Sequence, residues 1–473
     1  MPSIDFSDCP AEIDVLVVGA GMAGHAAAIA AREAGADVLL LEKEADYGGS
    51  SLLSGATFAF AGTPQQAEQG IEDDGEQLRA DLLDVGGHHN DPAIVDLYIE
   101  HQLATYAWLR SIGVAFQEVQ LSSNMSRPRS HPAVPRQIFA CLRERLAAVG
   151  AGYLCATRAG ALERDGAGRV AAVVLAQGDA ERRIAVRGGT VLASGGFARN
   201  DHLVQTFVPD QAAAMRLGGS GSHGDGLVMG WALGADLADV GYIKATFGIA
   251  KPDYPGANRT YDGPRPLIHA MYRGGIAVNR TGRRFISEAS SYKVLGDACL
   301  TQPDAVAFQI FDARVMGESR EAPRTHDYAG ARAQGLLIEA NSIGALASAA
   351  GLDVDAVTDT VARYNAACEG READAFGRTT LGMGYGTPPP LTEPPFYCYP
   401  CTSGLFTTYG GLRTDTRLVV TDVWGKPIDG LFAAGEVMGG FHGKGYMSGS
   451  AMGKAAVFGR LAGRHAAEAA AAV

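Results

Sequence analysis

Three side chains that can donate, accept or relay protons lie close together near the C-terminal end of the chain: His442, Tyr446 and Ser448. They belong to the stretch 430–463, which is dominated by glycine and other small residues. Because glycine lacks a side chain, such backbone can press closely against a flat ring. We therefore predict that this stretch seats a flavin ring, and that residues 442–448 form one wall of a substrate site.

A nucleotide-binding pattern lies near the N-terminus. An apolar strand (14–18) leads into the sequence GAGMAG at 19–24, an alanine-rich helix (22–34) follows, and a second strand (37–41) ends at Glu42. Glycines in this context let backbone approach a pyrophosphate, whose charge the helix N-terminus stabilises. An acid at the position of Glu42 accepts hydrogen bonds from ribose hydroxyls and disfavours a 2′-phosphate. The pattern predicts a Rossmann-like dinucleotide site.

A second glycine and serine cradle, GGSSLLSGA at 48–56, follows directly. FAD needs such a second contact for its ribityl chain and isoalloxazine ring, whereas simple NAD sites do not. An ordinary serine- and glycine-rich loop is the alternative interpretation. A strand at 190–194 also closes on Gly195-Gly196, and Asp225 lies near the start of a predicted helix.

The residues expected to hold FAD are small or carry a side-chain acceptor oxygen, except for the cationic Lys43. They are Gly19, Gly21, Ala23, Gly24, Glu42, Lys43, Gly49, Ser50, Ser51, Gly55, Ala56, Ala159, Ser194, Gly195, Asp225, Gly435, Glu436, Ser450 and Ala451. Ser450 and Ala451 are placed at a helix start, where the helix dipole would stabilise negative charge on the N1/O2 edge of a reduced flavin. Glu436 is expected to bind a ribityl or ribose hydroxyl.

The composition and net charge of the chain limit the classes of binding partner and the cellular location that we expect. The chain has 473 residues and a net charge of −12, which argues against nucleic acid or an anionic membrane as partner. Seven cysteines, an odd number, do not suggest a disulfide framework. The N-terminus lacks the apolar segment of a signal peptide. No apolar run reaches membrane-span length. We expect a cytoplasmic protein without an integral membrane segment. We expect no metal site at His88-His89, and two buried thiols at Cys398 and Cys401.

The fold class expected is α/β, with an α+β cap inserted into a Rossmann-like FAD-binding domain. Residues 242–395 are richer in arginine and aromatic residues, carry an amphipathic helix (354–368) and end in the proline-rich TPPPLTEPP. We therefore place the substrate or capping domain at 242–395. The FAD-binding domain would then be discontinuous, covering 1–241 and 396–473.

Across nearly its whole length the chain resembles flavoproteins of the fumarate reductase/succinate dehydrogenase superfamily. The resemblance rests on VVGAGMAG, LEKEADYGGSSLLSGA, LASGGFARN, SHGDGLVMGWALGADL, GGIAVNRTGRRFISE, YGGLRTDT and GLFAAGEVMGGFHG. It implies FAD, a capping domain, and hydride transfer between the flavin and a carbon of a C–C double bond. The family's flavin-linking histidine is missing from GGSSLLSGA, which implies noncovalent FAD. No haem-attachment motif is present.

Two loops depart from the dicarboxylate reductases of that family. Where those enzymes carry an arginine after the GGVHG segment, this chain has Tyr446-Met-Ser448, and four residues after Glu288 it has Tyr292 instead of arginine. Both changes resemble the 3-ketosteroid Δ4 and Δ1 dehydrogenase and cyclic-ketone dehydrogenase branch. The arginines around 280–284 could still bind an acid, but they look like the family's strand turn.

The resemblance implies an FAD-dependent dehydrogenase that introduces a C–C double bond α,β to the ketone of a cyclic substrate. Tyr446, with a backbone N–H near Ser450, would polarise the carbonyl. Tyr292 would take the α-proton, with His442 or Lys444 lowering its pKa or relaying the proton, and Ser448 as a further relay. Tyr409 could also face the substrate.

Two other functions stay open on the sequence. The same geometry serves the reverse reaction, an ene-reductase acting on an activated alkene or enoate. A non-catalytic subunit for electron relay or assembly is the alternative of another class, although the intact loop 442–448 argues against it. The electron acceptor is unidentified, and the substrate is expected to be a small cyclic ketone or enone.

Overall fold

The computed structural model describes residues 4–251, 266–321 and 323–472. The chain divides into two compact units. The first comprises Met1–Pro209, Leu217–Ile243 and Phe406–Val473, and the second comprises Asp210–Arg216 and Lys244–Leu405.

The first unit is built on a sheet of eight strands whose central path runs β17-β18-β8-β1-β2-β5. Its strands are β1 (Glu12–Val18), β2 (Val38–Leu41), β5 (Gly152–Leu154), β8 (Ala180–Leu192), β17 (Val419–Thr421) and β18 (Pro427–Ala433). β1 pairs in parallel with β2 and β8, and β18 pairs in parallel with β8. The two strands predicted at 14–18 and 37–41 are confirmed. Parallel strands place their carboxyl ends at one edge, where ligands of such sheets bind.

The remaining strands of the large sheet form a meander. β6 (Arg158–Arg164) pairs antiparallel with β7 (Val170–Gln177), and β7 pairs antiparallel with β8. This confirms the small meander expected over 151–191. Two short sheets complete the unit, β3 (Thr57–Ala59) with β4 (Ser130–Pro132) and β10 (Leu237–Ala238) with β16 (Gly411–Leu412).

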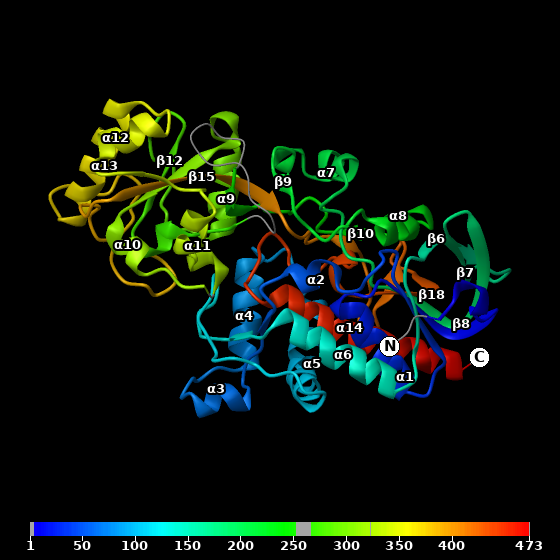
Figure 1. Ribbon diagram of the computed structural model, residues 1–473. Helices are drawn as coiled ribbons and strands as arrows, with labels where there is room; N and C mark the ends of the chain where they lie inside the picture. Colours follow the sequence, from blue (N-terminus) through cyan, green and yellow to red (C-terminus); the bar gives the residue numbers. More distant parts are fainter. Residues whose placement is uncertain (1–3, 252–265, 322, 473) are drawn as a thin grey trace. The chain divides into compact units, whose positions relative to one another are not determined.

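Two helices from opposite ends of the chain pack against each other in the first unit (Figure 1): α1 (Met22–Glu33) and α14 (Ser450–Ala471). A Cβ on Gly459 would lie 2.4 Å from the carbonyl oxygen of Ala23, and one on Gly463 would lie 2.0 Å from that of Ala27. These two glycines are therefore required by the close approach of the helices. Part of the glycine excess in 430–463 serves packing rather than a ligand.

The other helices of the first unit are α2 (Gly49–Leu53), α3 (Pro64–Glu68), α4 (Gly75–Val85), α5 (Pro92–Ser111), α6 (Pro135–Ala148), α7 (Asp201–Phe207) and α8 (Asp225–Ala232). Two of them contact this pair, α6 against α1 and α5 against α14. α5 is the helix expected after Asp91, whose carboxylate accepts a hydrogen bond from Ala93 N at 3.0 Å. Tyr106 and Trp108 are buried, as predicted.

The second unit has a sheet of six strands on the path β11-β15-β13-β12, with β9 and β14 also paired to β15. The strands are β9 (Met215–Arg216), β11 (Thr246–Ala250), β12 (Ile276–Asn279), β13 (Ala307–Phe311), β14 (Ile338–Ala340) and β15 (Phe396–Leu405). The helices are α9 (Tyr292–Leu300), α10 (Ala313–Gly317), α11 (Tyr328–Ala333), α12 (Ile343–Ala349) and α13 (Val354–Cys368). The pairings are antiparallel except β9 with β15. α13 begins and ends at the predicted residues. Cys398 and Cys401 are buried free thiols in β15, as expected.

Four buried histidines predict acid sensitivity. Burial lowers the pKa of His25, His131, His269 and His326 to about 4. Between about pH 6.5 and 4 these side chains bind protons in the unfolded chain but not in the folded one, so stability falls as the pH falls. Each histidine contributes on the order of 2–3 kcal/mol over that range. We expect the thermal midpoint followed by circular dichroism to drop steeply between pH 7 and pH 5.

The matched variant for this prediction is His326→Phe, which removes one of the four titrating rings from a site lined by Tyr328 and Tyr385. It should flatten the pH dependence of the midpoint. A midpoint that does not change between pH 7 and pH 5 in the parent protein would contradict the prediction.

Candidate active site

The glycines around the start of α1 have two different roles, close packing within the protein and access for a ligand. Gly19 has φ +106°, and its Cβ would lie 2.5 Å from the carbonyl oxygen of Ala193; a Cβ on Gly24 would lie 1.7 Å from the carbonyl oxygen of Gly19. Protein packing requires these two glycines. Gly21 instead has an ordinary φ of −79°, and its Cβ would meet Ser51 Oγ at 3.6 Å as the nearest atom. A Cβ on Gly21 would therefore make only ordinary van der Waals contacts, at the helix N-terminus where backbone N–H groups can hold a phosphate.

Glu42 lies at the end of β2 and is largely buried. Its carboxylate accepts hydrogen bonds from the backbone N–H of Ala20 at 2.9 Å and of Glu44 at 3.0 Å. Burial raises the pKa of Glu42, and these hydrogen bonds oppose the shift. The bonds fix the carboxylate beside the glycine turn, where the ribose of a dinucleotide lies in this fold.

The second cradle is tied to the segment 218–226. Ser50 Oγ accepts a hydrogen bond from Gly219 N at 2.9 Å and lies 3.1 Å from Ser222 Oγ. Ser51 Oγ accepts one from Met22 N at 3.3 Å and so links this cradle to α1. A Cβ on Gly49 or Gly55 would meet nothing within 4 Å, so both leave open space. The segment 218–226 is a wall of the cradle that the sequence did not connect to it.

Ser194 and Glu436 follow the carboxyl ends of β8 and β18. The hydroxyl oxygen of Ser194 is buried and has no hydrogen-bond partner among the described residues. Glu436 Oε1 accepts a hydrogen bond from Thr408 N at 2.7 Å, and burial raises the pKa of this carboxyl. A buried polar atom without a partner is unusual in a folded protein. A polar ligand at this edge would satisfy it.

The other predicted cofactor residues are more varied. Lys43 forms an ion pair of 2.8 Å with Asp225, the first residue of α8. Ala23 is buried in α1, and Ala56 and Ala159 are also buried. The roles assigned to these residues stay predictions.

α14 begins at Ser450, as expected, and no side chain caps its N-terminus. Ser450 Oγ donates to Met447 O at 2.7 Å and lies 3.4 Å from His442 Nδ1. The first turn of a helix with uncapped N–H groups stabilises negative charge nearby. This supports the placement of the helix start at a flavin edge.

Three aromatic rings meet beside this helix start and form what we call the aromatic cluster: Tyr409, His442 and Tyr446. The ring of Tyr409 lies 5.8 Å from that of Tyr446, nearly parallel to it at 15°, and His442 lies 5.5 Å from Tyr409 and 5.6 Å from Tyr446. Tyr409 and His442 are buried, whereas Tyr446 and Ser448 are partly exposed. The partly exposed ring of Tyr446 therefore rests on a stacked, largely apolar support.

Residues far away in the sequence hold the loop 442–448. Asn124 Nδ2 donates to Tyr446 O at 2.7 Å, Ser448 N donates to Ser123 O at 3.2 Å, and Lys444 N donates to Gly86 O at 2.9 Å. The exposed ammonium of Lys444 lies 5.4 Å from the ring centroid of Tyr242. The sequence showed no sign of these anchors, because the contacts are non-local and the residue types are ordinary.

Tyr292 belongs to the second unit, where it is the first residue of α9. The buried ring of His269 stacks on it at 5.4 Å and 20°. His269 Nε2 donates to Phe247 O at 3.0 Å, and the buried ammonium of Lys293 lies 5.8 Å from the Tyr292 ring centroid. The structure thus brings His442, Tyr446 and Ser450 together in one unit and places Tyr292 in the other.

The arginines of the 280–284 turn are engaged with acids. Arg284 is bonded to Glu288 and Asp374, which raises its pKa, while Arg280 pairs with Asp304. Arg284 is therefore a structural residue of the second unit rather than an available carboxylate clamp.

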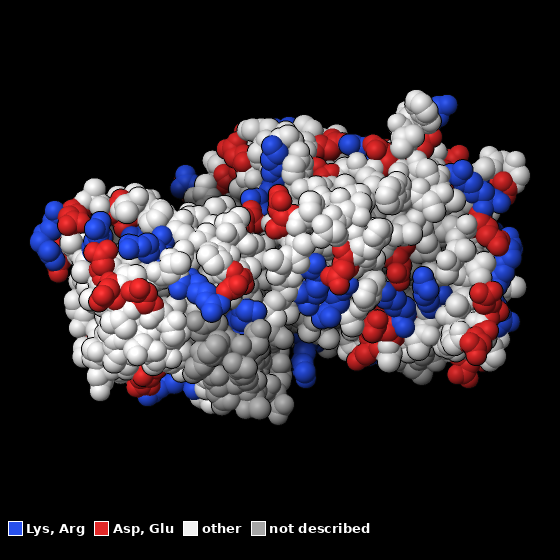
Figure 2. Space-filling model, turned by 90° about the horizontal axis from the view of Figure 1, so that it is seen from above, with Lys and Arg blue, Asp and Glu red and all other residues white. Residues whose placement is uncertain are grey.

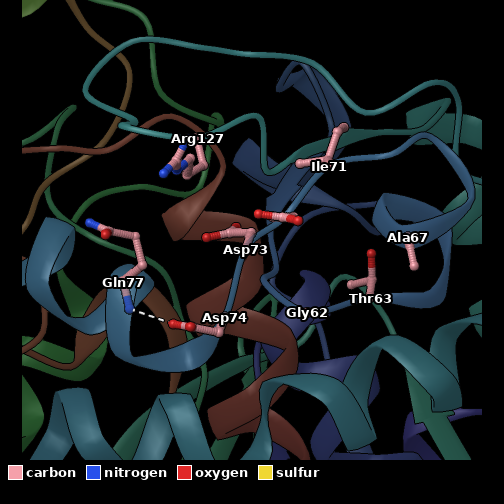
Figure 3. Close-up of a pocket in the computed structure, with 9 residues that line it drawn as sticks. Gly62, Thr63, Ala67, Ile71, Asp73, Asp74, Gln77 and Arg127 are labelled. Atoms are coloured by element: carbon pink, nitrogen blue, oxygen red, sulfur yellow. Dashed lines mark hydrogen bonds between the residues drawn. The ribbon is translucent and has the colours of Figure 1, made fainter.

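A cavity of about 520 Å³ lies between α3 and the start of α4 (Figure 3), and none of the predicted site residues lines it. Asp73 at its wall is bonded to the buried Arg129, and Asp74 caps α4 by accepting from Gln77 N at 2.8 Å. These acids have structural partners already.

Charge and metal ligands single out no further site. On the face drawn in Figure 2, acidic and basic side chains are interspersed and neither sign forms a continuous patch. Within the described ranges, no group of three histidine, cysteine or acidic side chains could hold a metal ion. No helix of the described part is long and apolar enough to cross a membrane.

Comparison with known proteins identifies the family. Residues 14–451 match the family described as FAD binding domain. The chain belongs to this family of flavoproteins. A protein named "Probable fumarate reductase Ifc3" from Shewanella frigidimarina is 31% identical to it over 96% of this chain and 74% of its own length.

Solved structures agree with the family assignment. A flavocytochrome c3 fumarate reductase in an open conformation matches with a TM-score of 0.83 and 29% identity, covering 98% of this chain and 79% of its own. The 3-ketosteroid Δ4-(5α)-dehydrogenase of Rhodococcus jostii RHA1 in complex with 4-androstene-3,17-dione matches with a TM-score of 0.77 and 27% identity, covering 98% of both chains. The superfamily, the α/β fold class, the FAD cofactor and the oxidoreductase class predicted from sequence are confirmed.

The flavoprotein's own residues fit FAD. The open space at Gly49 and Gly55, the absence of a tight contact at Gly21, the buried hydroxyl of Ser194 and the uncapped α14 all belong to the first unit. Gly21 and α1 would hold the pyrophosphate, and α14 the ring. The protein is an FAD-binding oxidoreductase. Noncovalent attachment stays a prediction.

Proposed function

We propose that this flavoprotein is a dehydrogenase that introduces a C–C double bond next to the ketone of a cyclic substrate. The observation that carries the proposal is the aromatic cluster, which offers the phenol of Tyr446 on a stack of rings. A dicarboxylate needs a fixed cation at that place, because guanidinium groups hold carboxylates through paired hydrogen bonds. A phenol on an apolar support suits a neutral carbonyl oxygen and a flat ring better.

The proposed roles follow from donor and acceptor capacity. Tyr446 donates a hydrogen bond to the substrate's carbonyl oxygen and makes the neighbouring α-proton more acidic. The role of base stays a prediction for Tyr292, on whose ring that of His269 stacks within the second unit. His442, bonded to the α14 start through Ser450, supports the Tyr446 ring. Bound FAD supplies the hydride acceptor for the carbon next to the α-carbon.

Similarity over the full length of a steroid-binding neighbour supports the ketone substrate. The Rhodococcus jostii dehydrogenase binds 4-androstene-3,17-dione and is covered to 98% by this chain. A smaller cyclic ketone satisfies the same donor geometry, so the proposal names the cyclic-ketone class rather than a steroid.

The second candidate is an ene-reductase that adds hydride and proton to an activated alkene. The 31% identity to a protein named as a probable fumarate reductase favours this direction. Hydride transfer between flavin and carbon is reversible, so the electron partner and the substrate potential set the direction. The electron acceptor and the cytoplasmic location stay open predictions.

Anaerobic flavin spectroscopy separates the two candidates. Saturated cyclic ketones are added to the oxidised protein, and bleaching of the flavin band near 450 nm is expected if it is a dehydrogenase. In the mirror experiment, the reduced protein is mixed with cyclic enones and with enoates such as fumarate. Absence of bleaching by every saturated ketone, together with rapid reoxidation by enoates, would overturn the proposal in favour of the reductase.

A further inference from the structure

Lys454 is a buried cation that none of the roles above uses. It lies in the second turn of α14 with a relative exposure of 1%. Its ammonium donates a hydrogen bond to the carbonyl oxygen of Met438. Burial lowers its pKa to about 8, and attraction by Glu436 and Asp239 opposes that shift. A buried group stays charged near neutral pH only when hydrogen-bond acceptors and opposite charges compensate for the lost water.

Glu436 and Asp239, the two acids whose charges attract Lys454 without forming an ion pair with it among the described residues, are bonded to the segments that carry the aromatic cluster. The Asp239 carboxylate accepts hydrogen bonds from Gly440 N at 3.0 Å and from Gly443 N at 3.2 Å, on both sides of His442. Glu436 accepts from the backbone N–H of Thr408 at 2.7 Å and from its hydroxyl at 3.3 Å, one residue before Tyr409. Both carboxylates therefore hold backbone N–H groups next to residues of the aromatic cluster.

The same face of α14 contacts the loop at two points. Ser450 and Lys454 are four residues apart, which places them one above the other on a helix. Ser450 Oγ reaches His442, and Lys454 reaches Met438. The ammonium therefore connects the helix expected to face the flavin with Met438, which precedes the loop 442–448.

We propose that Lys454 is a positioning residue whose ammonium balances Asp239 and Glu436 and so fixes His442 and Tyr409 behind Tyr446. The inference rests on the proposed function for its effect on substrate, but its electrostatic part does not. A buried positive charge beside the flavin seat favours the reduced, more negative flavin, and a buried negative charge does the opposite.

The test uses the FAD-loaded full chain and the variants Lys454→Met, Asp239→Asn and the double variant. Lys454→Met keeps the length of the side chain and removes the charge, leaving Asp239 without its balancing cation. We expect this variant to retain FAD, to lose at least about ten-fold in kcat/KM, and to show a lower flavin midpoint potential. Asp239→Asn should raise the midpoint potential. The double variant should return near the parent value and recover most of the lost kcat/KM.

The midpoint potentials need no substrate, so they test Lys454 even if cyclic ketones prove inert and the proposed function fails. If Lys454→Met does not fold, the sign of the shift in Asp239→Asn and the potential of Lys454→Arg, expected to match the parent, carry the test. Equal potentials in all variants, or a double variant whose shift and activity loss match those of Lys454→Met alone, would overturn the inference.

Discussion

Replacing Tyr446 with phenylalanine is expected to lower turnover by about 10²–10³-fold while the protein keeps its FAD, because one donor to a developing oxyanion is worth that much. The change removes one oxygen and leaves the ring that stacks on Tyr409 at 5.8 Å. Since Tyr446 O and Ser448 N are held by backbone and Asn124, the loop should keep its place. Steady-state turnover of a cyclic ketone, with the flavin content from the visible spectrum, gives the result.

Tyr409→Phe is the matched control for this prediction. It removes the same atom from the same stack, but Tyr409 is fully buried, whereas Tyr446 is partly exposed. Its effect on turnover should stay within about ten-fold, because the hydroxyl it removes is buried and is not the proposed donor to the substrate. A fully active Tyr446→Phe variant, or equal losses in both variants, would show that the Tyr446 hydroxyl does not polarise the substrate.

The nucleotide-binding half of the site could be predicted from sequence because it is local. The order of strand, glycine turn, helix, strand and acid covers only residues 12–42, from β1 to Glu42, and each part has a backbone reason for its residue type. The helix start at Ser450 and the buried strand with Cys398 and Cys401 were predictable in the same way. These elements are determined by short-range sequence patterns, so the structure contains them where the sequence predicts them.

The support of the substrate loop could not be predicted, because it is long-range and made of common residues. Asp239 holds Gly440 and Gly443 from about two hundred positions away, and Asn124 holds Tyr446 from more than three hundred. Nothing about an isolated aspartate or asparagine distinguishes a loop anchor from a solvated surface residue. Lys454 also looked like an ordinary helix lysine until its burial was known.

The sequence also could not separate glycines that bind from glycines that pack. Gly24 and Gly463 would each place a Cβ within 2.0 Å of a backbone oxygen, so any side chain there would displace the fold itself. A Cβ on Gly55 would meet nothing within 4 Å, and one on Gly21 would make only ordinary van der Waals contacts, the nearest at 3.6 Å. Both kinds share one residue type, and only the surrounding atoms distinguish them.

That distinction gives the sharpest test of the cofactor seat. Gly21→Val is expected to weaken FAD binding by about 100-fold or more, on the order of 3 kcal/mol, while the apoprotein folds with an unchanged thermal midpoint. The backbone at Gly21, φ −79° and ψ −167°, suits a β-branched residue, and the nearest obstacle to a Cβ is 3.6 Å away. A valine there would occupy the space at the α1 N-terminus where a pyrophosphate must approach the backbone. Retained flavin and the dissociation constant from FAD titration of the apoprotein measure the effect.

Gly166→Val provides the matched control, because Gly166 also has open space around its Cβ but lies in the turn between β6 and β7. It should bind FAD like the parent. A Gly21→Val protein that still copurifies with stoichiometric FAD would place the pyrophosphate elsewhere. A Gly21→Val apoprotein that fails to fold would mean that Gly21 is a packing glycine like Gly24, since a ligand clash has no effect on a chain without its ligand.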